Sequence, residues 1–304
     1  MTPVSPFDEI RARRRAGQLV VIDGGMGSEL EAQGARMDHD AWSGLVNVED
    51  PGLVRRVHED YVRAGADVLI TNTFMSGIGP LERAGRAEVF AQANRNAVGA
   101  AQDAARAADR PIAVAGSVSV TALGAPEVSP GDEQRRLREG YLRQIELLAG
   151  EGVDLIALEM VDHPRYAEPA VEAARSSGLP LWLGLCVHAD TGDGATPPRA
   201  VISDEHRHAL SLAGGAPFDA VCVMHTELRD VDDALAAVRE SWAGPVGVYP
   251  HHGVWVRPHW RFAPLPADHF AGLARGWRDA GVEMIGGCCG IGPAHIAALA
   301  RLSD

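Results

Sequence analysis

Short apolar runs alternate with amphipathic segments along almost the whole chain. Eight runs have the length and apolar content of buried parallel strands, and each precedes a segment whose apolar residues recur every three or four positions. The predicted strands cover residues 19–23, 67–70, 111–115, 153–158, 181–185, 218–221, 246–249 and 282–285. The predicted helices cover residues 51–64, 81–108, 133–150, 164–176, 204–213, 231–240, 267–280 and 293–302, with a Gly- and Pro-rich loop at 190–198.

Eight strand–helix pairs in one chain predict an α/β fold of the (β/α)8 TIM barrel type, for which about 250 residues are typical. A single barrel domain over residues 1–304, with residues 1–15 as an N-terminal extension, fits this length. A doubly wound parallel sheet is the alternative. In a barrel the active site lies at the C-terminal ends of the strands. The polar residues there are Asp23, Thr71 to Thr73, Ser117, Glu159, Cys186, Cys222, Tyr249 to His251, Cys288 and Cys289.

Composition narrows the class of function. The net charge of −13 argues against a partner that is a nucleic acid or an anionic membrane, so a small-molecule substrate is expected. No secretory signal opens the chain and no apolar run reaches the roughly 18 residues that span a bilayer. We therefore expect a cytoplasmic protein. Its four cysteines, two of them adjacent, do not resemble a disulfide framework.

The adjacent cysteines Cys288 and Cys289 lie between Gly286-Gly287 and Gly290, where a predicted strand turns into a helix. Neighbouring cysteines can hardly bond to each other without strain, but both thiolates can meet one metal ion if the glycines let the backbone bend. Zinc is the candidate ion. Three protein ligands would leave a fourth position for water or substrate. The glycines near residue 25 lack the spacing of a dinucleotide motif, so no nicotinamide cofactor is expected.

Five segments together resemble the homocysteine S-methyltransferase family, zinc-dependent barrel enzymes that pass a methyl group to the thiol of homocysteine and so make methionine. The resemblance covers most of the chain, and its last segment is the most specific. The five segments are 23–30, 71–74, 114–117, 158–159 and 285–290.

The resemblance implies both a metal site and an amino-acid site. Zinc would make the acceptor thiol a thiolate, the nucleophile of the reaction, with no further catalytic group. Cys222, Cys288 and Cys289 would hold the zinc. Asp23 and Glu159 would hold the ammonium of homocysteine, while the backbone at Gly24 and the hydroxyl of Thr73 would take its carboxylate.

The methyl donor implied is a small sulfonium or ammonium compound, with S-methylmethionine the first choice. Aromatic faces or acidic groups would suit such a cation, and Trp42, Trp255 and Trp260 are available. The sequence does not place these tryptophans, and it leaves open whether the chain forms a homo-oligomer.

Departures from the family pattern concern the third zinc ligand and the substrates. The family's first zinc cysteine follows Gly-x-Asn, whereas here counting from the preceding strand puts Val223, not Cys222, at that position. A shift of one place would aim Cys222 away from the metal unless a bulge re-aims it, and His225 is the alternative ligand. Segments 117–121 and 249–253 also depart. Two alternatives therefore stay open: a relative acting on another thiol or methylated compound, and a zinc-less barrel with a binding role.

Overall fold

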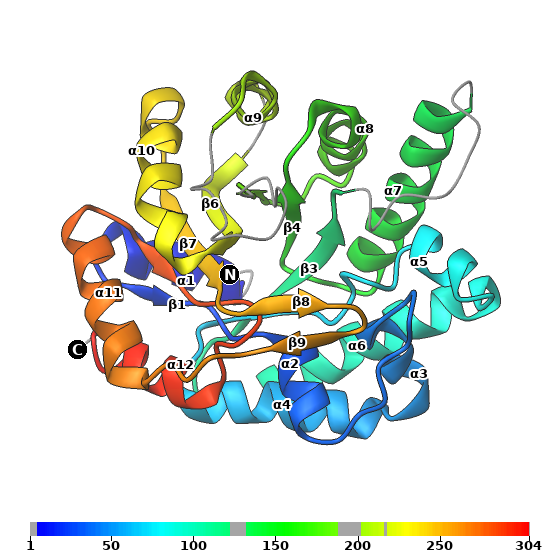
Figure 1. Cartoon of the computed structure of the whole chain (residues 1–304), viewed down its shortest axis with the longest axis horizontal. Coiled ribbons are helices and arrows are strands. Elements are labelled where there is room, and N and C mark those ends of the chain that lie inside the picture. Colours follow the sequence, from blue (N-terminus) through cyan, green and yellow to red (C-terminus); the bar gives the residue numbers. More distant parts are fainter. Residues whose placement is uncertain (1–4, 122–131, 188–201, 216–217, 304) are drawn as a thin grey trace.

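The computed structural model describes residues 5–121, 132–187, 202–215 and 218–303, which form a (β/α)8 barrel surrounded by helices (Figure 1). Eight strands pair in parallel in the order β1-β10-β7-β6-β5-β4-β3-β2. A parallel bridge between Ile22 and Val68 joins the two ends of this sheet, so the ring closes. The predicted barrel is confirmed, and the doubly wound alternative is excluded because an open sheet would leave those edges apart.

The observed elements follow the predicted ones closely. The barrel strands are β1 (Val20–Val21), β2 (Val68–Ile70), β3 (Ala113–Ser119), β4 (Leu155–Val161), β5 (Leu181–Leu185), β6 (Phe218–Glu227), β7 (Val246–His251) and β10 (Met284–Ile285). The hairpin β8 (Val254–Val256) and β9 (His259–Arg261) was not predicted. The helices are α1 (Pro6–Arg15), α2 (Met26–Ala32), α3 (Val46–Glu49), α4 (Pro51–Ala64), α5 (Ile78–Arg83), α6 (Phe90–Arg106), α7 (Glu133–Gly150), α8 (Pro164–Arg175), α9 (Asp204–Ser211), α10 (Val231–Ser241), α11 (Ala267–Asp279) and α12 (Pro293–Ala300).

One predicted helix, 81–108, is two helices in the structure. Helix α5 ends at Arg83, and Gly85 follows with φ +66°, a conformation that suits glycine and stops the helix. The loop predicted at 190–198 lies outside the described residues. None of the helices that the structure describes has both the length and the apolar content needed to cross a membrane.

Alternate residues of each strand face two different apolar layers. On β6, Val221 and Val223 pack outward against the helices, whereas Cys222 and Met224 point into the barrel.

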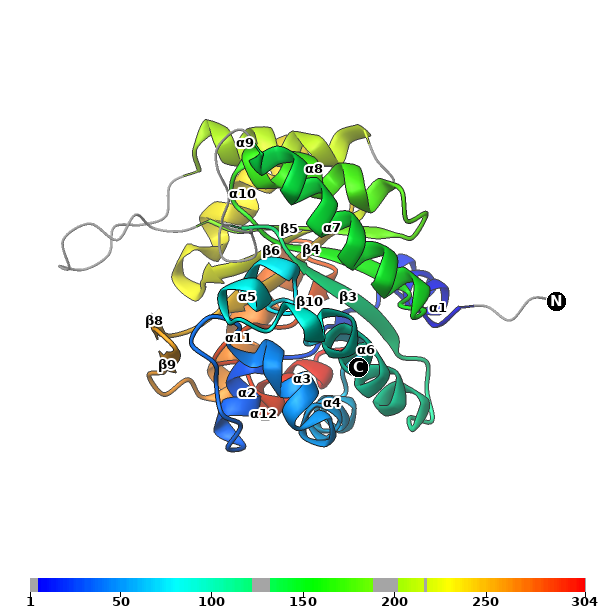
Figure 2. The same ribbon diagram turned by 90° about the vertical axis from the view of Figure 1, so that its right-hand side faces the viewer.

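Helix α1 packs against the interior residues at one end, where the Phe7 ring meets Trp182 at 6.1 Å between centroids. Figure 2 shows α1 and the β8–β9 hairpin at opposite ends of the barrel. The N-terminal segment therefore covers the end of the barrel remote from the hairpin.

His58 on α4 is a buried histidine whose ring nitrogens have no hydrogen-bond partner among the described residues. Burial lowers its pKa to about 3. As pH falls below about 6.5, the unfolded chain binds a proton that the folded chain refuses, so the free energy of unfolding falls. Between pH 7 and pH 5 we expect the free energy of unfolding, measured with urea, to fall by about 2 kcal/mol more in the wild type than in His58→Leu. Equal losses in the two proteins would contradict this assignment.

Candidate functional site

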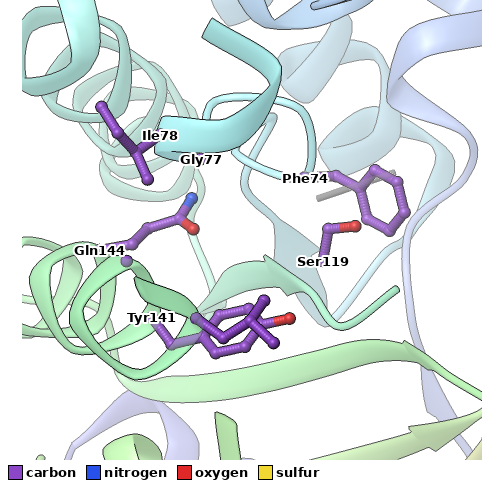
Figure 3. A pocket seen from close by; sticks show the side chains of 8 residues that line it. Phe74, Gly77, Ile78, Ser119, Tyr141 and Gln144 are labelled. Atoms are coloured by element: carbon purple, nitrogen blue, oxygen red, sulfur yellow. The ribbon is translucent and has the colours of Figure 1, made fainter. Parts of the chain in front are cut away.

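A cleft of about 860 Å³ opens where the barrel strands end. Ligand sites usually enclose about 300–1,000 Å³, so this volume suits a small substrate or two. The strand-end residues that line it include Ser117, Glu159, His225, Tyr249, Cys288 and Cys289. A second cavity, lined by Phe74, Ser119, Tyr141 and Gln144 among others, has about 10 Å³ (Figure 3). That volume is close to one water molecule, so the large cleft is the candidate substrate site.

Cys288 and Cys289 occupy the turn between β10 and α12. The Cys288 N–H donates to Pro250 O at 2.7 Å, which ties the turn to the end of β7. The two sulfurs lie 3.5 Å apart, and both residues line the cleft. A Cβ on Gly286 would come within 2.7 Å of Asp23 O, so the close approach to the segment that follows β1 requires glycine there. The turn thus presents two thiols to the cleft from adjacent positions.

His225 lies between Cys288 and Glu159. Its Nδ1 is 3.2 Å from the Cys288 Sγ, and its Nε2 is 2.9 Å from Glu159 Oε2. The other carboxylate oxygen of Glu159 accepts a hydrogen bond from the Ser117 hydroxyl. A continuous chain of contacts therefore runs from β3 through β4 and β6 to the cysteine turn.

Two irregular positions shape this chain of contacts. His225 has φ +54° and Met160, next to Glu159, has φ +60°. The pairing register shifts at both places, between Met224 and Glu227 on β6 and between Leu158 and Val161 on β4. Bulges of this kind change the direction of side chains and occur often beside functional sites.

The charge states of the cysteine turn depend on its neighbours. The contact with Cys289, and then burial, raise the pKa of the Cys288 thiol well above its ordinary value. Without a bound cation, Cys288 is therefore a thiol at neutral pH. Burial opposes charge on His225, yet Cys288 and Glu159 together raise its pKa to about 10. Glu159, which faces the other ring nitrogen, stabilises a charged His225 from that side.

The structure does not bring Cys222 to the other two cysteines. Cys222 points into the barrel and pairs with Gly247, three residues before the Pro250 that binds the Cys288 N–H. Three strand residues span about 10 Å, so Cys222 lies about that far along the barrel from the cysteine turn. A Cβ on Gly247 would lie only 2.5 Å from the Cys222 sulfur, so the thiol fills a packed space there. Burial raises the pKa of this thiol to about 12.

Three predicted substrate contacts lie behind the cleft wall. Asp23 is buried, and its Oδ2 accepts the Ile70 N–H at 2.9 Å. Burial raises the pKa of Asp23 well above its ordinary range, and the charge of Glu159 adds to this.

The Gly24 carbonyl accepts from the Tyr249 hydroxyl at 3.0 Å, and the Thr73 hydroxyl donates to Ser117 O at 2.7 Å. The residues that line the cleft include Glu159 but not Asp23, Gly24 or Thr73.

The donor set of this site can be compared with the needs of zinc. No three His, Cys, Asp or Glu side chains in the described part of the chain are placed to hold an ion as they stand. Tetrahedral zinc would separate two sulfur ligands by about 3.8 Å and a sulfur and a nitrogen ligand by about 3.6 Å. The observed separations are 3.5 Å for Cys288 to Cys289 and 3.2 Å for Cys288 to His225. The chemistry of the set fits zinc, and these two separations are close to those of co-ligands.

The hairpin adds an aromatic wall that the sequence did not place. The ring of Trp255 lies 5.5 Å from that of Trp42 and 5.5 Å from that of Trp260, between centroids. All three tryptophans line the cleft. The β-branched and aromatic run Val254-Trp255-Val256, followed by Arg257-Pro258, was the available signal for a strand and turn, but three residues are too few to indicate a strand from sequence.

Comparisons with known proteins point to one family. The family model described as Homocysteine S-methyltransferase matches residues 20–303. Homocysteine S-methyltransferase 4 of Zea mays is 30% identical, over 95% of this chain and 90% of its own. Selenocysteine methyltransferase of Astragalus bisulcatus is 26% identical, over 95% of this chain and 93% of its own. The metallated crystal form of the homocysteine methyltransferase MmuM of Escherichia coli matches with a TM-score of 0.77 and 27% identity, over 96% of this chain and 99% of its own.

Proposed function

Because the chain belongs to the homocysteine S-methyltransferase family, we propose that it methylates the thiol of homocysteine from a small cationic donor, S-methylmethionine above others. The observation that carries this proposal is the pair of thiols that line the cleft, one of which contacts His225. Zinc bound there would supply the chemistry that turns the acceptor thiol into a thiolate nucleophile. We propose Cys288 and Cys289 as two of its ligands.

The protein's own groups would bind and orient the acceptor. Glu159 is the carboxylate on the cleft wall beside the cysteine turn, and it suits the ammonium end of an amino acid. Asp23, in the layer behind, would hold the end of β2 through the Ile70 N–H. Gly24 and Thr73 would likewise support the strand ends through Tyr249 and Ser117, instead of touching the substrate carboxylate.

The donor proposed is a cation because aromatic faces and carboxylates line the same cleft. Trp42, Trp255 and Trp260 offer ring faces, and Asp40 and Glu227 also line the cleft. Attraction between a cation and an aromatic face is worth about 0.5–2 kcal/mol. A sulfonium or a quaternary ammonium fits this wall, and among them a sulfonium is the better methyl donor.

A second candidate function is methyl transfer to a different thiol or selenol. It is favoured by the 249–253 segment, where His251 and His252 both approach the Glu227 carboxylate, at 3.4 and 3.6 Å. Of these side chains His251 and Glu227 line the cleft, so they are polar groups available to an acceptor.

Purified protein loaded with zinc should form methionine from homocysteine and S-methylmethionine, measured by chromatography. Replacing S-methylmethionine by glycine betaine tests an ammonium donor on the same preparation. Product from selenocysteine or another thiol, with none from homocysteine, would favour the second candidate. No methylation of any thiol by protein that carries its metal would contradict both.

The aromatic wall gives a separate prediction. In Trp255→Ala we expect the KM for S-methylmethionine to rise about 5- to 30-fold, because a contact worth about 1–2 kcal/mol is lost. The KM for homocysteine should stay within about twofold. Trp255→Phe, which retains a ring face, should recover most of the loss. Equal increases in both KM values would show that the hairpin acts on the whole cleft and not on the donor.

A further inference from the structure

We propose that this chain holds its metal with two thiolates and one imidazole: Cys288, Cys289 and Nδ1 of His225. Glu159 then acts as the positioning partner of the histidine, and Cys222 takes no part. The inference rests on the proposed function, since the ion is the one that activates the acceptor thiol. Its test reads the ion itself, so it can fail while the function stands.

The two ring nitrogens of His225 already have the partners that a metal-bound histidine requires. Its Nε2 faces Glu159 Oε2 at 2.9 Å, so the ring, once an ion displaces the Nδ1 proton, keeps its hydrogen on Nε2 and donates it to the carboxylate. That tautomer leaves the lone pair of Nδ1 on the side of the Cys288 sulfur, 3.2 Å away. Ligating histidines usually donate their other N–H to a carboxylate in this way.

The backbone of β6 is bent where His225 needs it. Val221 and Val223 face the outer layer while Met224 faces the interior, so regular alternation would send residue 225 outward to the helices. The φ of +54° at His225 and the register shift beyond Met224 turn its side chain inward instead. A left-handed conformation in a non-glycine residue costs about 1–3 kcal/mol and persists where the surrounding structure fixes it.

Neighbouring groups hold the bent segment and the ring in place. The ring of His225 lies beside the Phe74 ring at 5.2 Å and the Tyr249 ring at 6.3 Å between centroids. The carbonyl of His225 accepts from the Nδ1 of His251 at 2.9 Å. A ligand that is fixed in this way loses little conformational freedom when an ion binds.

Replacing a thiolate by an imidazole changes the charge of the site. Zinc with two thiolates and a neutral imidazole carries no net charge, whereas three thiolates would leave one negative charge. A neutral centre opposes the entry of an anionic acceptor thiolate less than a negative one does. An imidazole in place of a third thiolate therefore suits a zinc site whose fourth ligand is the sulfur anion of the acceptor.

X-ray absorption at the zinc edge on the full chain, purified without chelator or histidine tag, tests the inference. We expect the wild type to show two sulfur neighbours at about 2.3 Å and nitrogen or oxygen neighbours at about 2.0 Å. His225→Cys should keep the ion and gain a third sulfur. His225→Ala should weaken zinc binding at least 10-fold in competition with a chelator, while Cys222→Ser should change it by less than about threefold.

Three sulfurs in the wild type, with one lost in Cys222→Ser, would overturn the inference and leave the proposed function intact. A wild type that takes up no zinc would overturn the inference as well. The methylation assay on the same preparations then decides the proposed function separately, because product formation does not depend on which residues hold the ion.

Discussion

Cys288→Ser/Cys289→Ser is expected to abolish zinc binding and to lower kcat/KM for homocysteine by at least about 10³-fold. The hydroxyl of serine is a poor zinc ligand at neutral pH, and the variant would retain one of the three proposed ligands. A free thiol of pKa about 8.5 is mostly protonated at pH 7, so loss of the ion removes most of the nucleophile and its orientation together. Zinc per chain by elemental analysis and initial rates of methionine formation measure the two effects.

Cys222→Ser is the matched control, because it makes the same change in a buried cysteine that points into the barrel, away from the turn. It should retain zinc and most of the activity. Circular dichroism should show the same helical content in both variants. If the double variant kept one zinc per chain and normal rates, the cysteine turn would have no role in the reaction.

The alternation of strands and helices sufficed to predict the barrel because its eight short apolar runs are buried over most of their length and regularly spaced. The ends of the strands were less predictable. Strand β6 was expected to stop at residue 221 but continues to Glu227, because the bulge at His225 lets pairing with β7 resume beyond it. No pattern of apolar residues reports a bulge of this kind. Helix α1 was not predicted either, because few of its residues are apolar.

The rim of the barrel was predicted correctly as the place where polar residues gather, but the direction of each side chain was not. Glu159 and the cysteine turn line the cleft, while Asp23 and Thr73 turn to neighbouring strands and satisfy backbone groups there. Sequence spacing places a residue at a strand end, whereas the local twist and bulges decide which way it points. The same limit applies to Cys222 and His225. The sequence left either of them open as the third ligand, and only the register shift on β6 shows that His225 is the one whose side chain reaches the cysteine turn.

Glu159→Gln is the second variant with a large expected effect, because Glu159 contacts the proposed metal ligand His225 and also lines the cleft. The amide keeps the size of the side chain but loses the charge that faces the His225 Nε2. Loss of a carboxylate partner typically weakens metal binding about 10- to 100-fold. We expect a loss of this size in zinc affinity, measured by chelator competition. Glu172→Gln, which changes a carboxylate on the surface of α8 paired with Arg138, is the control that should leave zinc affinity unchanged.

Kinetics on two acceptors separate the two roles that Glu159 can have. If it orients His225, then kcat falls for homocysteine and equally for 4-mercaptobutanoate, an analogue without the amino group, and excess zinc restores part of the activity. If instead it only holds the ammonium, the KM for homocysteine rises, the analogue is unaffected and zinc affinity does not change. The contact at 2.9 Å with His225, together with the hydrogen bond from Ser117, leaves each carboxylate oxygen already engaged, which favours the first outcome. A carboxylate fixed on both sides holds the histidine ring, and the second lone pair on each oxygen is still free to accept from the ammonium of the acceptor.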